Sequence, residues 1–244
     1  MKSIVRRSLV ILFLLTLAES ANCTFADDPF PKRILFIGNS YTGGTKSGIE
    51  FFLKQANPEI KLQFIHPGGR RLSNHVKNEQ TLKTIAEGKW DLVVLQEQSQ
   101  LPSLTGFRDE YLRAGVLLSQ AVRTGNSDCM LFETWGRRDG DKQNPKLSPD
   151  FSTMQQRLSE GYATLGERTA TPIAPVGQAW AILHDESPEL FAKLYARDGS
   201  HPSPLGAYLT GSVFYAAVTG KDPVDIKALP RGIGENDAKS LRAA

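Results

Sequence analysis

A serine follows an apolar run near the start of the chain, in RILFIGNSYTGG at positions 33–44. A polar, glycine-containing turn after a strand can hold a phosphate or present a nucleophile. A phosphate-binding loop needs Gly directly before Lys-Ser, but Thr45 occupies this position before Lys46 and Ser47. The dinucleotide pattern G-x-G-x-x-G also fails, because Ser40 stands at its second glycine. The pattern therefore favours Ser40 as a nucleophile.

A nucleophilic serine needs a base, and the segment YARDGSHPS supplies Asp198 and His201. An aspartate three residues before a histidine can hold Nδ1 of the ring, so that Nε2 faces the serine as general base. Two alternatives remain at this point: Ser40 caps a helix, and Asp198 and His201 form an ordinary surface turn. No G-x-S-x-G motif occurs in the chain, so the usual α/β-hydrolase elbow is not indicated.

Short apolar runs alternate with longer amphipathic ones, which predicts the scaffold that must position these residues. Buried strands without strict alternation indicate an α/β fold, a three-layer α/β/α sandwich with a central, mostly parallel five-stranded sheet. Ligands bind at the carboxyl ends of such strands, where Ser40 lies. A long loop is predicted at 136–149, and the tail from Asp222 is expected to be weakly ordered. The expected strands are 33–38, 61–65, 91–96, 129–133 and 171–176, and the expected helices are 46–55, 73–87, 109–123, 149–168 and 204–218.

The N-terminus has the pattern of a secretory signal peptide. Three basic residues, Lys2, Arg6 and Arg7, precede an apolar run at 9–17, and small residues follow it. This run is shorter than the about 20 residues of a membrane span, so a permanent anchor is the weaker alternative. Cleavage after Ala26 or after Ser20 fits the pattern, while Asn22 before Cys23 disfavours a lipoprotein site. We expect a signal peptide at 1–26, export to the periplasm or beyond the cell, and no stable membrane span afterwards.

The remaining chain, 27–244 with a core at about 33–220, is predicted to be one globular domain. The sequence has 244 residues, of which 40% are hydrophobic and 23% charged. Loss of 1–26 removes three bases and one acid, so the formal charge falls from +3 to +1, too low for a nucleic-acid partner. Cys129 then stands alone and is expected to pack in the core. No ligand set for a metal is present, no cofactor is implied, and the oligomeric state is not indicated.

Two motifs resemble the SGNH (GDSL-like) hydrolases: FIGNSYT is similar to their first block, and DGSHPSPLGAYLTG to their last. The resemblance extends from Arg33 to about Gly220. It implies a serine esterase with Ser40 as nucleophile and Asp198 and His201 completing the triad. It also implies an oxyanion hole formed by the Ser40 N–H, a glycine N–H of the second block and an asparagine amide of the third.

The chain departs from the family pattern at two places. Asn39 replaces the aspartate that usually precedes the serine, and QEQS replaces G-x-N-D in the third block, so that Gln98 is expected to supply the amide. In the second block we expect Gly69 to supply the N–H. His66 and His75 flank this glycine and are expected to be polar surface residues without a metal role.

The substrate is less strongly indicated. Asn39, Tyr41 and Trp135 follow predicted strands and are expected to contact it, with Trp135 stacking on a sugar ring. The resemblance and the predicted export favour removal of O-acetyl groups from carbohydrate. The alternatives are a lipase, thioesterase or aryl esterase of the same fold, a catalytically silent carbohydrate-binding relative, and a structural envelope protein tethered by an uncleaved N-terminus.

Overall fold

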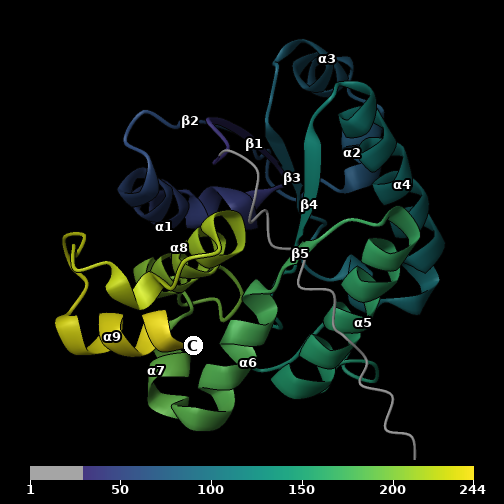
Figure 1. The fold of residues 1–244 in the computed structure, drawn as a ribbon. Coiled ribbons are helices and arrows are strands. Elements are labelled where there is room, and N and C mark those ends of the chain that lie inside the picture. The colour runs from purple at the N-terminus through teal and green to yellow at the C-terminus, as the bar shows by residue number, and fades with distance from the viewer. Residues whose placement is uncertain (1–29) are drawn as a thin grey trace, which may run out of the picture.

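The computed structural model describes residues 30–244, so the predicted signal peptide lies outside the described residues. Five strands form one sheet in the order β2-β1-β3-β4-β5, and every neighbouring pair is parallel (Figure 1). The predicted five-stranded parallel sheet is therefore confirmed. The strands are β1 (Arg33–Ile37), β2 (Lys61–Ile65), β3 (Leu92–Leu95), β4 (Asp128–Phe132) and β5 (Ile173–Ala174).

Helices cover both faces of the sheet, because successive side chains of the central strands point to opposite sides. In β1, Ile34 and Phe36 belong to one buried cluster, while Leu35 and Ile37 belong to the other. This arrangement is the predicted three-layer sandwich. The first face is covered by α1 (Ser40–Ala56), α6 (Val176–Glu186), α7 (Pro188–Lys193), α8 (Pro204–Thr219) and α9 (Glu235–Ala243), and the second by α2 (Leu72–Val76), α3 (Glu79–Glu87), α4 (Arg108–Thr124) and α5 (Phe151–Thr169).

Three details of the helices differ from the sequence prediction. The helix expected at 73–87 is two helices, since the Asn78 side chain accepts a hydrogen bond from Thr81 N (2.7 Å) and starts α3 anew. The sequence analysis assigned no element to α6 and α7. The prediction of a weakly ordered tail from Asp222 was wrong as well: α9 packs on α8 through Ala238 and Leu241, both fully buried.

The sheet topology places the site. From β1 the chain first adds β2 on one side and later β3 on the other, so the carboxyl ends of β1 and β3 form the switch point at which open parallel sheets bind ligands. The turn after β1 carries Ser40.

Elsewhere, Cys129 is buried in β4, where desolvation raises its pKa to about 11, so its predicted packing role is confirmed. No helix within residues 30–244 combines the length and apolarity needed to cross a bilayer.

Candidate active site

Ser40 is the first residue of α1, directly after the turn that leaves β1. Asn39 caps this helix, with its Oδ1 accepting a hydrogen bond from Tyr41 N (3.1 Å). A side chain at Gly38 would collide with Thr42 Oγ1 and with the Gln96 side chain, so only glycine fits the turn. As the first residue of the helix, Ser40 has an N–H without an intrahelical acceptor, and the helix dipole favours negative charge there.

Asp198, His201 and Ser40 form one hydrogen-bonded chain. Asp198 Oδ2 lies 2.6 Å from His201 Nδ1, and His201 Nε2 lies 2.9 Å from Ser40 Oγ. Asp198 Oδ1 also accepts the N–H groups of Ser200 (2.9 Å) and His201 (3.0 Å). Burial pulls the pKa of Asp198 upward, but the hydrogen bonds from the His201 ring and these two N–H groups outweigh it and hold the pKa below its ordinary value. The geometry is that of a nucleophile, a base and its orienting carboxylate.

Two aromatic residues hold the His201 loop against α1. Tyr41 stacks on Trp135 (centroids 4.7 Å apart) and meets the His201 ring edge-on (5.4 Å). Trp135 Nε1 donates to Ser200 O (3.0 Å), and the Tyr41 hydroxyl is 2.7 Å from Ser200 Oγ. Trp135 is fully buried and Tyr41 is 2% exposed. The predicted substrate contacts of both residues are therefore wrong: neither ring has a free face for a sugar, and both support the triad from behind.

This support predicts the effect of Trp135→Phe. The change keeps an aromatic ring beside Tyr41 but leaves the partly buried Ser200 carbonyl without its indole donor. We expect the free energy of unfolding to fall by about 1 kcal/mol. We expect kcat to fall about 10-fold, because the His201 loop loses one of its contacts. Thermal unfolding and ester hydrolysis measure the two effects, and an unchanged kcat beside a lowered stability would contradict the positioning role.

Asn39 is also buried, at 2% exposed, so its predicted contact with substrate is wrong. Asn39 instead ties the three motif loops together through its side chain and its backbone: the side-chain Nδ2 donates to Arg70 O (2.9 Å) in the loop after β2. Its backbone N donates to Gln96 Oε1 (3.0 Å) at the end of β3, which also accepts from Thr42 Oγ1 (2.8 Å). The turn that carries Ser40 is thereby fixed to both neighbouring strands.

Gly69 lies in the exposed loop between β2 and α2. Its φ of +67° is a left-handed conformation that favours glycine, and no atom lies within 4 Å of where a β-carbon would be. Within the described residues, no acceptor takes its N–H. The loop is joined to the Ser40 turn through the Asn39–Arg70 hydrogen bond. The structure therefore leaves the Gly69 N–H available for a ligand.

The Gln98 side chain is mostly engaged in the turn that follows β3. Its Oε1 accepts the backbone N–H groups of Gln100 (2.8 Å) and Leu101 (3.3 Å), and its Nε2 donates to Gln100 Oε1 (3.1 Å). Within the described residues, one hydrogen of Nε2 has no acceptor. The Gln98 amide is thus held by the local turn through its oxygen and one of its two N–H groups.

Sequence analysis missed several buried polar residues around this site. His75 was expected at the surface but is 2% exposed, with Nε2 2.9 Å from Gly38 O; desolvation lowers its pKa, so the neutral ring is favoured. Glu97 is 1% exposed, and desolvation raises its pKa to about 7. Gln96 and Glu97 follow a buried strand directly, and this position was the sequence signal that could have found them. Burial of a polar side chain costs free energy unless it is hydrogen-bonded, so such a residue is expected to have specific partners.

The predicted loop 136–149 has no helix or strand and forms one wall of a pocket beside the triad. The pocket has a volume of about 280 Å³ and is bordered by His201 and Asp198 on one side and by Arg137, Asp139 and Lys142 on the other. The buried Asp141 carboxylate anchors the loop by accepting hydrogen bonds from side chains that include Arg137 and Gln100. Arg138 N donates to Gly199 O (2.9 Å), which joins the loop to the triad segment.

Comparison with known proteins agrees with this architecture. No protein-family model and no curated protein matches the sequence. A solved protein of Slackia heliotrinireducens, assigned as an SGNH hydrolase, is 28% identical with a TM-score of 0.64, over 76% of this chain and 97% of that one. A DUF4886 family protein from Bacteroides uniformis is 17% identical with a TM-score of 0.71, over 86% and 92%. The acetylxylan esterase Axe2 from Geobacillus stearothermophilus is 18% identical with a TM-score of 0.58, over 77% and 94%.

The last two similarities show the fold alone, whereas the Slackia protein is similar in sequence as well. The order of the strands, the position of Ser40 after β1 and the Asp198–His201 pair before α8 agree with the motif blocks read from the sequence. The chain therefore has the fold of the SGNH/GDSL-like hydrolases, a class of ester hydrolases, and is similar to them in its motif blocks and in the arrangement of Ser40, Asp198 and His201.

Proposed function

We propose that the protein is an exported serine esterase that removes O-acetyl groups from carbohydrate through an acyl-enzyme on Ser40. The observation that carries the catalytic part is the continuous hydrogen-bonded chain from Asp198 Oδ2 through His201 to Ser40 Oγ, with separations of 2.6 and 2.9 Å. A catalytically silent binding protein has no need for this alignment.

The reaction proceeds in two steps. His201 Nε2 takes the Ser40 proton while Oγ bonds to the ester carbonyl carbon; the tetrahedral intermediate collapses, and the alcohol leaves with the proton from His201. Water then enters, gives a proton to Nε2 and attacks the acyl-enzyme, which releases the acid and restores Ser40. The N–H groups of Ser40 and Gly69, with the free Nε2 hydrogen of Gln98, stabilise the oxyanion in both steps.

The polar pocket beside the triad supports a hydroxylated substrate. Glycine and polar or charged residues alone line it: Arg137, Asp139, Gly140, Lys142, Asp198, Gly199, Ser200 and His201. Such a lining offers hydrogen bonds to sugar hydroxyls and contains no aliphatic side chain and no Phe, Tyr or Trp to hold a fatty acyl chain. The solved proteins that share this fold include an acetyl-xylooligosaccharide esterase and two acetylxylan esterases, which is consistent with the same substrate class. Because Trp135 is buried, it does not support sugar binding by stacking, and the proposal depends on the polar and charged lining of this pocket.

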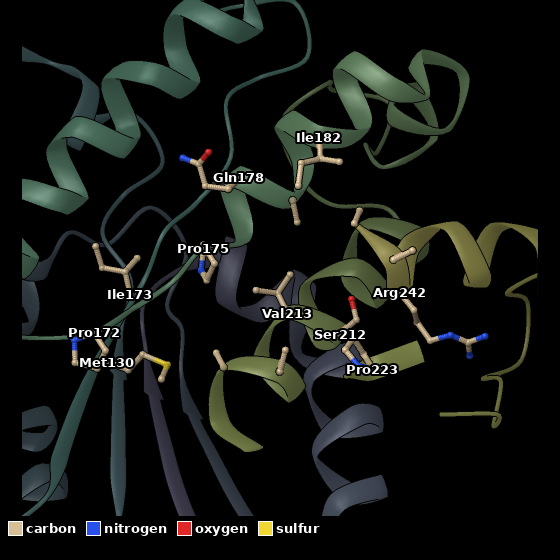
Figure 2. Close-up of a pocket in the computed structure, with 15 residues that line it drawn as sticks. Met130, Pro172, Ile173, Pro175, Gln178, Ile182, Ser212, Val213, Pro223 and Arg242 are labelled. Atoms are coloured by element: carbon tan, nitrogen blue, oxygen red, sulfur yellow. The ribbon is translucent and has the colours of Figure 1, made fainter. Parts of the chain in front are cut away.

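An apolar pocket elsewhere in the molecule does not serve the triad. It has a volume of about 490 Å³ and opens between β5, α6, α8 and the C-terminal residues (Figure 2). Ile173, Ile182 and Val213 point toward it, and no residue of the triad lines it. Its α8 residues begin at Ser212, about 12 Å along the helix from Pro204. This groove and the pocket beside the triad have no lining residue in common.

The experiment compares release of acetate from acetylated xylan, hydrolysis of p-nitrophenyl acetate and hydrolysis of p-nitrophenyl palmitate. We expect activity on the first two substrates and at least 100-fold lower kcat/KM on the third, because no aliphatic, Phe, Tyr or Trp side chain lines the pocket beside the triad. Preference for the palmitate would overturn the substrate class. Binding of xylan with no hydrolysis of any ester would favour the catalytically silent carbohydrate-binding protein over the esterase.

The proposed export is supported by the N-terminal sequence, in which basic residues precede an apolar run within 1–26.

A further inference from the structure

One carboxylate oxygen joins the two loops that hold the second and third oxyanion donors. Glu97 Oε1 accepts the backbone N–H of Leu72 at 3.1 Å and that of Gln98 at 2.6 Å. Leu72 begins α2 and ends the loop that contains Gly69. The same oxygen therefore sets the separation of the Gly69 loop from the Gln98 loop.

The Gly69 loop has few other contacts that could fix its position. The site of a β-carbon at Gly69 is open, and the loop is exposed from His66 to Arg70. Asn39 Nδ2 holds Arg70 O on the side of Ser40, and Glu97 holds Leu72 N on the side of β3. The direction of the Gly69 N–H depends on both of these anchors.

The surroundings of Glu97 indicate that its role is to accept hydrogen bonds through Oε1. It is 1% exposed, and its Oε2 has no hydrogen-bond partner in the part of the chain that the structure describes. Two neighbours of Glu97 come from α4: the Glu110 carboxylate and the buried Tyr111 hydroxyl, which also has no partner in the described residues. From α5, the Tyr162 hydroxyl accepts a hydrogen bond from the Glu97 N–H (3.3 Å). Arg71 precedes α2, and its positive charge favours the ionised form of Glu97. An apolar residue would pack here without this burial cost, but would leave two N–H groups unpaired.

We propose that Glu97 is a positioning residue for ester hydrolysis: its Oε1 fixes the Gly69 and Gln98 loops relative to each other and so sets the oxyanion hole around Ser40. This inference rests on the proposed function. Glu97 does not contact the substrate, so its removal acts on the transition state and leaves binding of the ester ground state nearly unchanged.

The test measures kcat and KM for p-nitrophenyl acetate, per folded molecule, in the full chain and three variants. Glu97→Leu removes the shared acceptor and is expected to lower kcat about 100-fold, with KM within about threefold. Glu97→Asp keeps the charge but is one methylene too short to reach both N–H groups, and is expected to lower kcat similarly. Glu97→Gln retains an acceptor oxygen at the same length and is expected to stay within about fivefold of the original kcat.

Glu133→Leu is the matched control. Glu133 is also a buried carboxylate at the end of a central strand, and its pKa is likewise raised by desolvation, but it binds the side chains of Gln155, Ser159 and Gln178 between α5 and α6. We expect this variant to lower stability and to retain kcat.

The possible results separate the two proposals. An original protein without Ser40-dependent hydrolysis overturns the proposed function, and the role of Glu97 falls with it. If hydrolysis depends on Ser40 but Glu97→Leu and Glu97→Asp retain the kcat of Glu133→Leu, the positioning role is overturned and the esterase stands. If Glu97→Leu does not fold, Glu97→Asp beside Glu97→Gln decides: equal kcat in the two contradicts the inference.

Discussion

Replacing Ser40 by alanine is expected to lower kcat for p-nitrophenyl acetate by about 10⁶-fold and to abolish covalent labelling by a fluorophosphonate. Ser40 Oγ is the hydroxyl that His201 Nε2 meets, at 2.9 Å, and it lies where the helix N-terminus favours developing negative charge. Alanine removes the bond-forming atom but leaves the oxyanion donors in place. A residual acceleration over the reaction in water is expected from these donors and from binding.

The matched control is Ser47→Ala. Ser47 lies on the same helix and is exposed to solvent, so its loss should leave kcat and labelling unchanged. Ser47→Ala is expected to change the free energy of unfolding by no more than about 0.5 kcal/mol. Ser40→Ala is expected to change it by a similar amount, plus the contribution of the lost hydrogen bond to His201. Labelling that persists in Ser40→Ala, or hydrolysis within tenfold of the original protein, would show that another residue is the nucleophile.

The part of the fold that sequence predicted well is the part that local patterns determine. The runs at 33–38 and 91–96 are apolar without alternation, and this pattern belongs to strands that are buried on both faces, as β1 and β3 are. The parallel order then placed Ser40 at the carboxyl edge of the sheet. Asp198 and His201 were paired correctly in space because their separation within one turn fixes their relation to each other.

The direction of side chains was predicted poorly, because it depends on contacts between segments far apart in sequence. Trp135 follows β4 and was expected to face a substrate, yet the packing of Trp180 on one face and Tyr41 on the other encloses it. Asn39 was expected to contact substrate and instead caps α1 and holds Arg70. Similarly, α9 is ordered by packing of Leu241 on α8 rather than by its own sequence, which is mostly polar.

The network of buried polar residues was missed for a related reason. Gln96 and Glu97 continue a strand whose side chains alternate between the two faces of the sheet, but the sequence alone does not show which backbone groups of other loops they meet. Gln96 Oε1 meets Asn39 N, and Glu97 Oε1 meets Leu72 N. Since unpaired N–H groups are costly in a buried site, these acceptors connect the three motif loops into one frame.

Asp198→Asn is expected to lower kcat by about 10³- to 10⁴-fold while preserving the fold. Asparagine keeps an oxygen for the N–H groups of Ser200 and His201, which Asp198 Oδ1 accepts at 2.9 and 3.0 Å, so the turn retains its shape. Its amide nitrogen, however, would donate to His201 Nδ1. The ring would then carry its proton on Nε2 and could not accept the proton of Ser40. The loss is expected to fall short of that at Ser40, because half of the Asp198 side chain is exposed to water and its charge is screened.

A second aspartate and histidine pair in the chain supplies the control for Asp198→Asn. His184 Nδ1 lies 2.7 Å from Asp185 Oδ1 at the end of α6, with both side chains partly exposed and no part in the triad. Asp185→Asn makes the same chemical change at a similar distance and is expected to leave kcat unchanged. Hydrolysis and thermal unfolding of both variants separate the orientation of the base from the loss of a surface hydrogen bond between a histidine and an aspartate. If Asp198→Asn retains kcat within tenfold of the original protein, His201 does not need the Asp198 carboxylate to hold its tautomer, and the active unit is a serine and histidine pair.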